Sequence, residues 1–283
     1  MTAPDTPRPD SCDTLAPVFP GTTRLRLTSA RTGQAHILQI AEPEGPAPAE
    51  GWPLIVSLDG NALFATFTET LRLQARFSPG REPALLVALG YEGDEPFPKP
   101  DRFRDFTPPA DPQALLARSS GAPWPASGGA AAFIAALREE ILPLIAARWP
   151  VDPARRALFG HSLSGLLALQ VLRDHPRIFA SYIIGSPSLW WPGVDGMSLD
   201  SAGWSAALEG GGCPRVHLGV GGEETPEMRR LYAELAQTFA ALPEGRMALT
   251  AEEVAGEEHV SVLPSLIARA VGVAQAPRDR AGG

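Results

Sequence analysis

The stretch 157–172 constrains the fold of this chain more than any other part of the sequence. A short apolar run leads into Gly160, Ser162 and Ser164, and a helix-compatible run follows. A sharp turn between a strand and a helix accepts only small flanking residues, and Gly160, Ser164 and Gly165 meet this demand. The pattern predicts a strand–turn–helix unit that holds the Ser162 hydroxyl at the carboxyl edge of a sheet.

This unit is typical of a nucleophile elbow, the G-x-S-x-G turn of serine hydrolases. The strict motif has Gly at the position of Ser164, and the departure is mild because Ser is also small. The N–H of Leu163 is expected at a helix N-terminus, where it can donate to an oxyanion. We therefore expect Ser162 to be the nucleophile and Leu163 to supply one oxyanion donor.

Apolar periodicity predicts the rest of the fold. The expected strands are 22–28, 36–40, 53–59, 84–89, 157–159, 180–184, 215–220 and 247–251. The expected helices are 130–148, with a kink at Pro143, and 166–173, 226–242 and 261–271. Strands that alternate with helices are typical of an α/β fold with a doubly wound, mostly parallel sheet. The first two strands predict antiparallel N-terminal strands at the sheet edge.

The domain organisation follows from the same pattern. Residues 1–20 are rich in Pro and Asp and are expected to form a poorly ordered arm, and 276–283 a tail. Residues 91–128 lack periodicity and contain many Pro, Gly and Ser, which indicates a lid or binding loop. Because 21–275 shows no repeat and no second core, we expect a single α/β domain there.

Composition narrows the classes of partner. The 24 basic and 32 acidic residues give a formal charge of −8, which argues against a nucleic-acid partner. Cys12 and Cys213 lack a metal-ligand neighbour at C-x-x-C spacing, so we expect free thiols in a reducing compartment and no metal site. No signal-peptide core and no membrane-spanning stretch are recognised, so we expect a cytoplasmic protein. A periplasmic protein trimmed of its leader would have the same sequence.

The chain contains five histidines that could activate the serine. His259 alone falls after the last expected strand and before the last helix, where the order serine–acid–histidine of α/β-hydrolases places the base. The other four lie in strands, in the elbow or at a helix end, namely His36, His161, His175 and His217. We therefore expect His259 to take the proton of Ser162.

A carboxylate should orient that imidazole and stabilise its charged form. Glu223 and Glu224 follow the strand 215–220 through two glycines, and both are candidates. Weaker candidates are Asp195 and Asp200, which lie in a Gly-rich loop, and Glu257 and Glu258, which are adjacent to the base.

A second oxyanion donor is expected in the loop after an early central strand. The turn at Gly60–Asn61 follows the strand 53–59, and the N–H of Asn61 would face the same space as that of Leu163. Asp59 beside it could be a simple turn residue.

Several blocks of the sequence resemble the esterase branch of the α/β-hydrolases, in particular the siderophore esterases that cleave enterobactin- and salmochelin-type trilactones. These blocks are 57–64, 89–91, 102–108, 128–149, 152–165, 186–191 and 259–264. The resemblance covers nearly the whole chain, and the joint presence of the blocks is far more specific than any one of them. It implies an α/β-hydrolase fold, a Ser-His site and hydrolysis of carboxylic esters.

The resemblance also bears on the acid. In this family an acidic residue stands two or three positions past the glycine of the late strand, which maps best onto Glu224. The resemblance therefore implies a triad of Ser162, His259 and Glu224. It also leaves open a Ser-His dyad without an acid, as in some members of the family.

Substrate-binding residues are suggested near the expected mouth of the site. Trp190 and Trp191 could stack on catechol rings, and Arg102 and Arg104 could meet the negative charge of a ferric catecholate. The competing interpretation is structural, with both tryptophans capping the core and the arginines forming ion pairs.

The resulting hypothesis is a serine carboxylic-ester hydrolase that cleaves the ester backbone of a ferric siderophore and releases iron. Such an enzyme needs no metal or organic cofactor, because the iron arrives with the small-molecule substrate. The first alternative is another hydrolase on the same scaffold, acting on a feruloyl-type, short-chain or thioester substrate, or an acyltransferase. The second is a non-catalytic binding protein, against which the intact Ser162 and His259 argue. The sequence makes no prediction of the oligomeric state.

Overall fold

The computed structural model of the protein describes residues 19–117, 123–194 and 200–276. The expectations for residues 1–18 of the arm, including Cys12, for Asp195 and for the tail after 276 lie outside the described residues. Within them, Cys213 is an exposed free cysteine. No helix in the described ranges combines the length and the apolar character needed to cross a bilayer.

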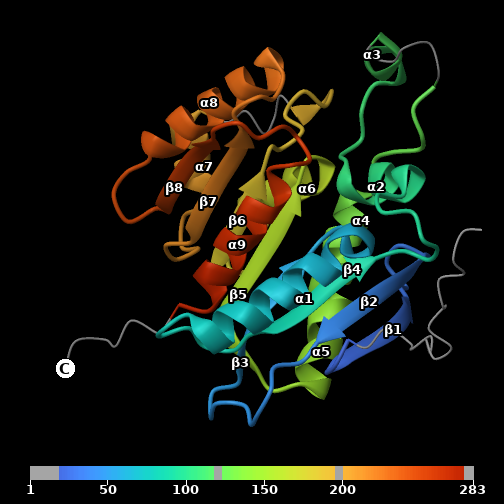
Figure 1. Ribbon diagram of the computed structural model, residues 1–283. Helices are drawn as coiled ribbons and strands as arrows, with labels where there is room; N and C mark the ends of the chain where they lie inside the picture. Colours follow the sequence, from blue (N-terminus) through green and yellow to red (C-terminus); the bar gives the residue numbers. More distant parts are fainter. Residues whose placement is uncertain (1–18, 118–122, 195–199, 277–283) are drawn as a thin grey trace, which may run out of the picture.

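An eight-stranded sheet forms the centre of the molecule (Figure 1). Its strands are β1 (Thr22–Thr28), β2 (Ala35–Ala41), β3 (Trp52–Ser57), β4 (Leu85–Gly90), β5 (Val151–His161), β6 (Ser181–Gly185), β7 (Arg215–Gly221) and β8 (Ala248–Val254). They lie in the order β1-β2-β4-β3-β5-β6-β7-β8. β1 pairs with β2 and β2 with β4 antiparallel, and all other pairs are parallel. The expected mixed sheet with antiparallel N-terminal edge strands is confirmed.

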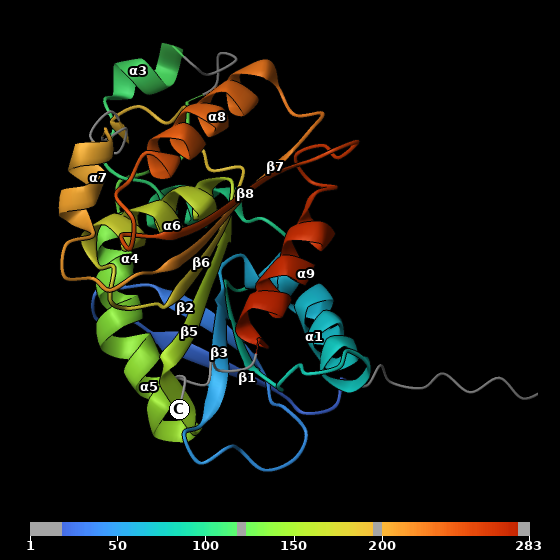
Figure 2. The ribbon, with the colours of Figure 1, turned by 90° about the vertical axis from the view of Figure 1, so that its left-hand side faces the viewer.

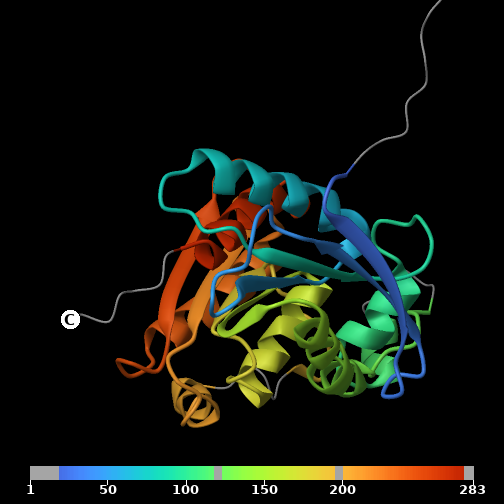
Figure 3. The same cartoon turned by 90° about the horizontal axis from the view of Figure 1, so that it is seen from below.

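Helices cover both faces of this sheet. They are α1 (Gly60–Phe77), α2 (Lys99–Phe106), α3 (Pro112–Ala117), α4 (Ala130–Ala136), the π-helical turn η1 (Leu137–Ile141), α5 (Leu142–Arg148), α6 (Leu163–Asp174), α7 (Ser201–Ala207), α8 (Pro226–Ala240) and α9 (Leu263–Ala274). Helices α1 and α9 lie together on one face, and α4, α5, α6 and α8 lie on the other (Figures 2 and 3). Because side chains alternate along a strand, β3 sends Leu54 and Val56 into one apolar core and Ile55 into the other.

The helices differ from expectation in two respects. The predicted helix 130–148 is interrupted by η1, which ends two residues before Pro143, so a π-helical turn precedes the residue without an N–H at which a kink was expected. Helices α1, α2, α3 and α7 were not predicted. In α1 the signal was present, since Leu63, Phe67 and Leu71 recur every four residues and are buried.

The topology determines where a site can form. The parallel strands β3, β5, β6, β7 and β8 end at the same edge of the sheet. In open α/β sheets this carboxyl edge is where ligands bind, and the segments that follow these strands carry the residues expected to do the chemistry.

Candidate active site

Ser162 occupies a strained turn between β5 and α6. Its φ of 60° and ψ of −119° lie in a region that non-glycine residues rarely adopt, and its N–H donates to the carbonyl of Gly185 at 2.9 Å. A Cβ at Gly160 would collide with the carbonyl oxygen of Ser164, and one at Gly165 would lie 2.7 Å from the carbonyl oxygen of Gly185. The two glycines are therefore required by the turn, and Ser162 is presented at the carboxyl edge.

His259 and Glu224 meet at the same edge. His259 lies in the segment between β8 and α9, and its Nδ1 is 2.7 Å from Oε2 of Glu224, which follows β7. The Glu224 side chain is 1% exposed, whereas Glu223 is exposed to solvent. The structure thus brings Glu224, and not Glu223, against the imidazole. Of the weaker candidates, Asp200 caps α7 by accepting the N–H of Gly203 at 2.8 Å.

Glu224 is held as a carboxylate by its hydrogen bonds. Burial raises its pKa, but hydrogen bonds from His259, from the Ser186 hydroxyl and from the Gly221 N–H lower it by more, so the net pKa lies below the ordinary value. An ionised Glu224 that accepts from Nδ1 fixes the tautomer of His259 in which Nε2 is free to accept a proton.

The serine and the histidine come from distant parts of the chain and are close in the fold. The rings of His259 and His161, the residue before Ser162, have centroids 4.6 Å apart. The Ser162 hydroxyl lies 3.3 Å from Oγ of Ser188, and no hydrogen bond joins it to His259 in this structure. Catalytic hydrogen bonds are often long without substrate and tighten in the complex, so the absence of this bond is compatible with the expected pairing of Ser162 and His259.

Two serines of the segment after β6 were not recognised from the sequence. Ser186 donates to Glu224 and has a φ of 39°, and Ser188 contacts the hydroxyl of Ser162. This short segment therefore connects the acid with the nucleophile. The signal in the sequence is that both serines stand shortly after the expected strand 180–184.

The candidate oxyanion donors face no competing acceptor. Among the described residues, neither the N–H of Asn61 nor that of Leu163 donates to another group. The Asn61 side chain is a structural anchor, since its Oδ1 accepts the N–H of Tyr91 at 2.8 Å and its Nδ2 donates to the Tyr91 carbonyl at 3.2 Å. These bonds hold the start of α1 against the segment after β4, which positions the free backbone N–H.

A buried polar chain joins the two segments that carry those donors. Ser164 Oγ donates to Oδ2 of Asp59 at 2.6 Å and accepts the N–H of His161 at 2.8 Å. Asp59 in turn accepts two bonds from Arg102, from Nε at 2.6 Å and from Nη2 at 3.0 Å. The Arg102 and Asp59 side chains are 11% and 1% exposed. Arg102 thus forms a nearly buried bidentate ion pair.

Known proteins resemble this chain in sequence and in fold. The family model described as Putative esterase matches residues 29–261. The chain belongs to this esterase family. It is 36% identical over 264 residues to the ferri-bacillibactin esterase BesA of Bacillus subtilis, a match that covers 92% of this chain and 91% of that protein. The predicted family and the predicted carboxylic-ester hydrolase activity are thereby confirmed.

Solved structures agree with this assignment. The BES protein from Bacillus cereus superimposes with a TM-score of 0.85 at 29% identity, covering 94% of this chain and 99% of that one. The siderophore hydrolase EstA from Aspergillus nidulans has a TM-score of 0.75 at 26% identity, covering 93% and 98% of the two chains. The α/β-hydrolase fold expected from the sequence is therefore confirmed.

His161 has an unusual environment in this esterase. Its side chain is 3% exposed, and neither ring nitrogen has a hydrogen-bond partner among the described residues. Burial, followed by the proximity of His259, lowers the pKa of His161 to about 3. The ring is therefore neutral and packs as an apolar wall against the imidazole of His259. The remaining histidines contact polar partners away from the site, namely His36 with Thr32, His175 with Arg138 and His217 with Glu252.

The four residues expected to bind substrate occupy different environments. Arg104 pairs with Asp101 and Asp105, each at 2.8 Å. Trp191 is buried, and its Nε1 donates to the carbonyl of Pro108 at 3.2 Å. With the Arg102 ion pair, three of the four therefore have structural contacts.

Trp190 is the fourth and is half-buried. Its ring lies 6.1 Å from that of Trp124, over which Nζ of Lys99 is placed at 4.8 Å from the ring centroid. Trp190 is two residues past Ser188, which contacts the nucleophile. An aromatic surface with a nearby ammonium group thus lies at the segment that follows Ser188, and Lys99 was not recognised from the sequence.

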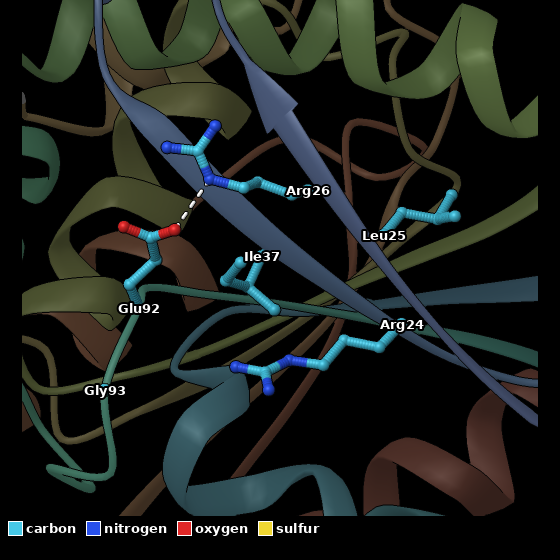
Figure 4. Close-up of a pocket in the computed structure, with 6 residues that line it drawn as sticks. All are labelled: Arg24, Leu25, Arg26, Ile37, Glu92 and Gly93. Carbon is cyan, nitrogen blue, oxygen red and sulfur yellow. Dashed lines mark hydrogen bonds and ion pairs between the residues drawn. The ribbon is translucent and has the colours of Figure 1, made fainter.

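A cavity of about 430 Å³ lies apart from this site, at the antiparallel edge of the sheet (Figure 4). It is lined by Arg24, Leu25, Arg26, Ile37, Glu92 and Gly93, and Arg26 pairs with Glu92 at 2.6 Å across it. None of the candidate catalytic residues contributes to this cavity. A second cavity, of about 350 Å³, adjoins Asn61.

Proposed function

We propose that this protein is a serine esterase that cleaves the ester backbone of an iron siderophore. The observation that carries the proposal is the 2.7 Å hydrogen bond from His259 to the buried Glu224, formed at the sheet edge where Ser162 occupies a strained elbow. Both features belong to a chain whose family is that of esterases. A serine, an oriented imidazole and a carboxylate constitute the triad of acyl-transfer enzymes.

The chemistry follows from these positions. His259 Nε2 takes the proton of Ser162, whose Oγ attacks the ester carbonyl. The N–H groups of Leu163 and Asn61 donate to the resulting oxyanion, and each such donor is worth about 3 kcal/mol of barrier. The imidazolium, stabilised by Glu224, protonates the departing alkoxide, and an acyl-enzyme remains. Water, activated by the same imidazole, then releases the acid.

The proposed substrate class rests on the relatives and on the aromatic surface. Two of them are a ferri-bacillibactin esterase and a siderophore hydrolase. Trp190, Trp124 and Lys99 offer stacking and a positive charge, which suit an aromatic, anionic ligand such as a ferric catecholate. Trp191 supports this surface, because its ring lies 5.8 Å from that of Trp190, whereas Arg102 and Arg104 form ion pairs with Asp59 and with Asp101 and Asp105. Iron enters as part of the substrate, and release in the cytoplasm is part of the proposal.

Product analysis on a substrate panel tests this function. Wild type, Ser162→Ala and the control Ser205→Ala are incubated with a catecholate trilactone, with and without Fe³⁺, and with a feruloyl ester and a short-chain ester, and products are identified by mass spectrometry. We expect ring opening of the trilactone by wild type and by Ser205→Ala, and none by Ser162→Ala. Equal cleavage by Ser162→Ala would contradict the mechanism. Cleavage of only the simple esters would reassign the substrate, and transfer to an added alcohol would indicate an acyltransferase.

A further inference from the structure

We infer that the 350 Å³ cavity beside Asn61 binds one uncharged, apolar arm of the ester substrate. This inference rests on the proposed function and specifies the substrate class of the same site. The cavity, called here the apolar pocket, is formed by the start of α1, by Phe97 and by the segment that leads into α9, and its walls include Asn61, Leu63, Val260, Leu263 and Ile267.

The position of the apolar pocket connects it to the reacting atoms. Asn61, whose backbone N–H is a proposed oxyanion donor, forms one wall, and Val260, which directly follows the proposed base His259, forms another. An ester carbonyl bound to that N–H and within reach of His259 therefore lies close to two of the residues that line the pocket. One of the two groups attached to the ester must extend in this direction.

The lining selects for an apolar group without charge. No charged side chain is among the described residues that form the pocket. Its amide group, on Asn61, is already bonded to the backbone of the segment after β4. A charged group placed here would lose its hydration without gaining a partner, whereas a hydrocarbon group would gain about 0.8 kcal/mol per buried methylene.

Val260 supports the same conclusion. It is 62% exposed and is one of five large apolar side chains with such exposure among the described residues. Its exposure beside the proposed base is explained when the substrate covers it. Phe97, another lining residue, contacts Arg102, whose Cζ lies 5.1 Å from the ring centroid, so this part of the lining packs against the buried polar chain that holds Asp59.

The size of the pocket sets the kind of group. A cavity of about 150 Å³ accommodates benzene, so about 350 Å³ holds an aryl ring or an alkyl chain of several carbons. The charged and aromatic features of the site, Lys99 with Trp124 and Trp190, are on residues outside this lining. For the proposed catecholate trilactone, the arm that enters this pocket is therefore one whose aryl ring carries no charge, whereas a negatively charged arm contacts the surface formed by Lys99, Trp124 and Trp190.

Two ester series test the inference, one with acyl chains from acetyl to hexanoyl and one with acetate esters of alcohols from ethanol to hexanol. We expect kcat/KM to rise roughly threefold to fourfold per methylene in one series with wild type. A carboxylate-ended chain of equal length is expected to lose this gain. Thr66→Trp fills the pocket from an exposed position on α1 and should abolish the rise of kcat/KM with chain length. The neighbouring control Ala65→Trp should retain this rise. Val260→Asp is the second pocket variant, chosen because an exposed position tolerates it.

The outcomes separate the two proposals. If no ester is cleaved in a Ser162-dependent manner, the proposed function fails and the pocket inference fails with it. If esters are cleaved but both series are flat in wild type, only the pocket inference is overturned. It is likewise overturned, with the proposed function intact, if Thr66→Trp and Val260→Asp retain the full chain-length dependence.

Discussion

The Ser164 hydroxyl donates a 2.6 Å hydrogen bond to Oδ2 of Asp59, and this bond joins the nucleophile elbow to the turn after β3. Ser164 follows the donor Leu163 by one residue, and Asp59 precedes the donor Asn61 by two. The bond therefore sets the separation of the two proposed oxyanion donors. We therefore expect the serine, at a position where the strict motif has glycine, to position these two donors.

Removal of that bond should reduce turnover more than binding. We expect Ser164→Ala and Ser164→Gly to lower kcat about tenfold to 100-fold, because the donors are displaced from the oxyanion, with KM changed less than about twofold. The free energy of unfolding should fall by about 1–3 kcal/mol, since a carboxylate oxygen of Asp59 loses a buried partner. Steady-state kinetics and urea unfolding measure both quantities. Ser205→Ala on α7 is the control, and a variant with unchanged kcat would refute the positioning role.

Glu224→Gln should lower kcat by about 100-fold or more, because an amide stabilises the imidazolium less and permits the wrong tautomer of His259. Glu223→Gln is the matched control, since it makes the same change one residue away on an exposed side chain, and it should retain wild-type kcat. Ester hydrolysis by both variants decides between a triad and a dyad. Activity of Glu224→Gln equal to that of the control would mean that Ser162 and His259 work alone.

Acid should destabilise the protein through His161. Burial lowers the pKa of His161 from 6.5 to about 3. At a pH between these two values, the His161 ring is neutral in the folded state and protonated in the unfolded state. Stability is therefore lost as the pH falls from about 6.5 towards 3, by up to about 1.4 kcal/mol per pH unit for this group. His36 and His175 also have lowered pKa values and add to the loss. The lowered pKa of Glu224 acts in the same direction only below its ordinary value of 4.5.

Urea unfolding at about pH 7, 6 and 5 measures this dependence. His161→Phe keeps an aromatic ring but has no nitrogen that titrates. It should therefore reduce the slope of the unfolding free energy against pH by the contribution of one proton, about 1.4 kcal/mol per pH unit. His161→Phe with the full wild-type slope would show that the buried ring does not contribute.

Substitution of the two neighbouring tryptophans should affect different quantities, namely substrate binding for Trp190 and the free energy of unfolding for Trp191. Trp190→Ala is expected to raise KM for an aromatic substrate with little effect on unfolding, because Trp190 is half-buried beside Trp124. Trp191→Ala is expected to cost about 3–5 kcal/mol of unfolding free energy, because the ring is 1% exposed. Thermal unfolding together with ester kinetics distinguishes the two. The opposite pattern, with KM controlled by Trp191, would contradict the assignment.

Much of the fold could be predicted because strands buried on both faces appear as continuous apolar runs. β3, β4 and β7 were recognised in this way, and each agrees with the prediction within two residues at either end. α2 and α3 were missed because they are short and lie between prolines, where local periodicity is too brief to detect. The resulting prediction of 91–128 as a lid or binding loop overlooked these helices.

By itself the sequence determined which residues are the candidates for the chemistry and their order along the chain. Ser162 between its small neighbours, and His259 before the last helix, could be proposed because a strained turn restricts side-chain size and because the parallel topology restricts where a base can stand. Only the tertiary structure decided which side chains contact one another at the site. That Glu224 rather than Glu223 meets His259, and that Arg102 meets Asp59, depends on contacts between segments 35 and 43 residues apart. Such contacts depend on how the loops at the sheet edge pack together, which no local pattern of residues encodes.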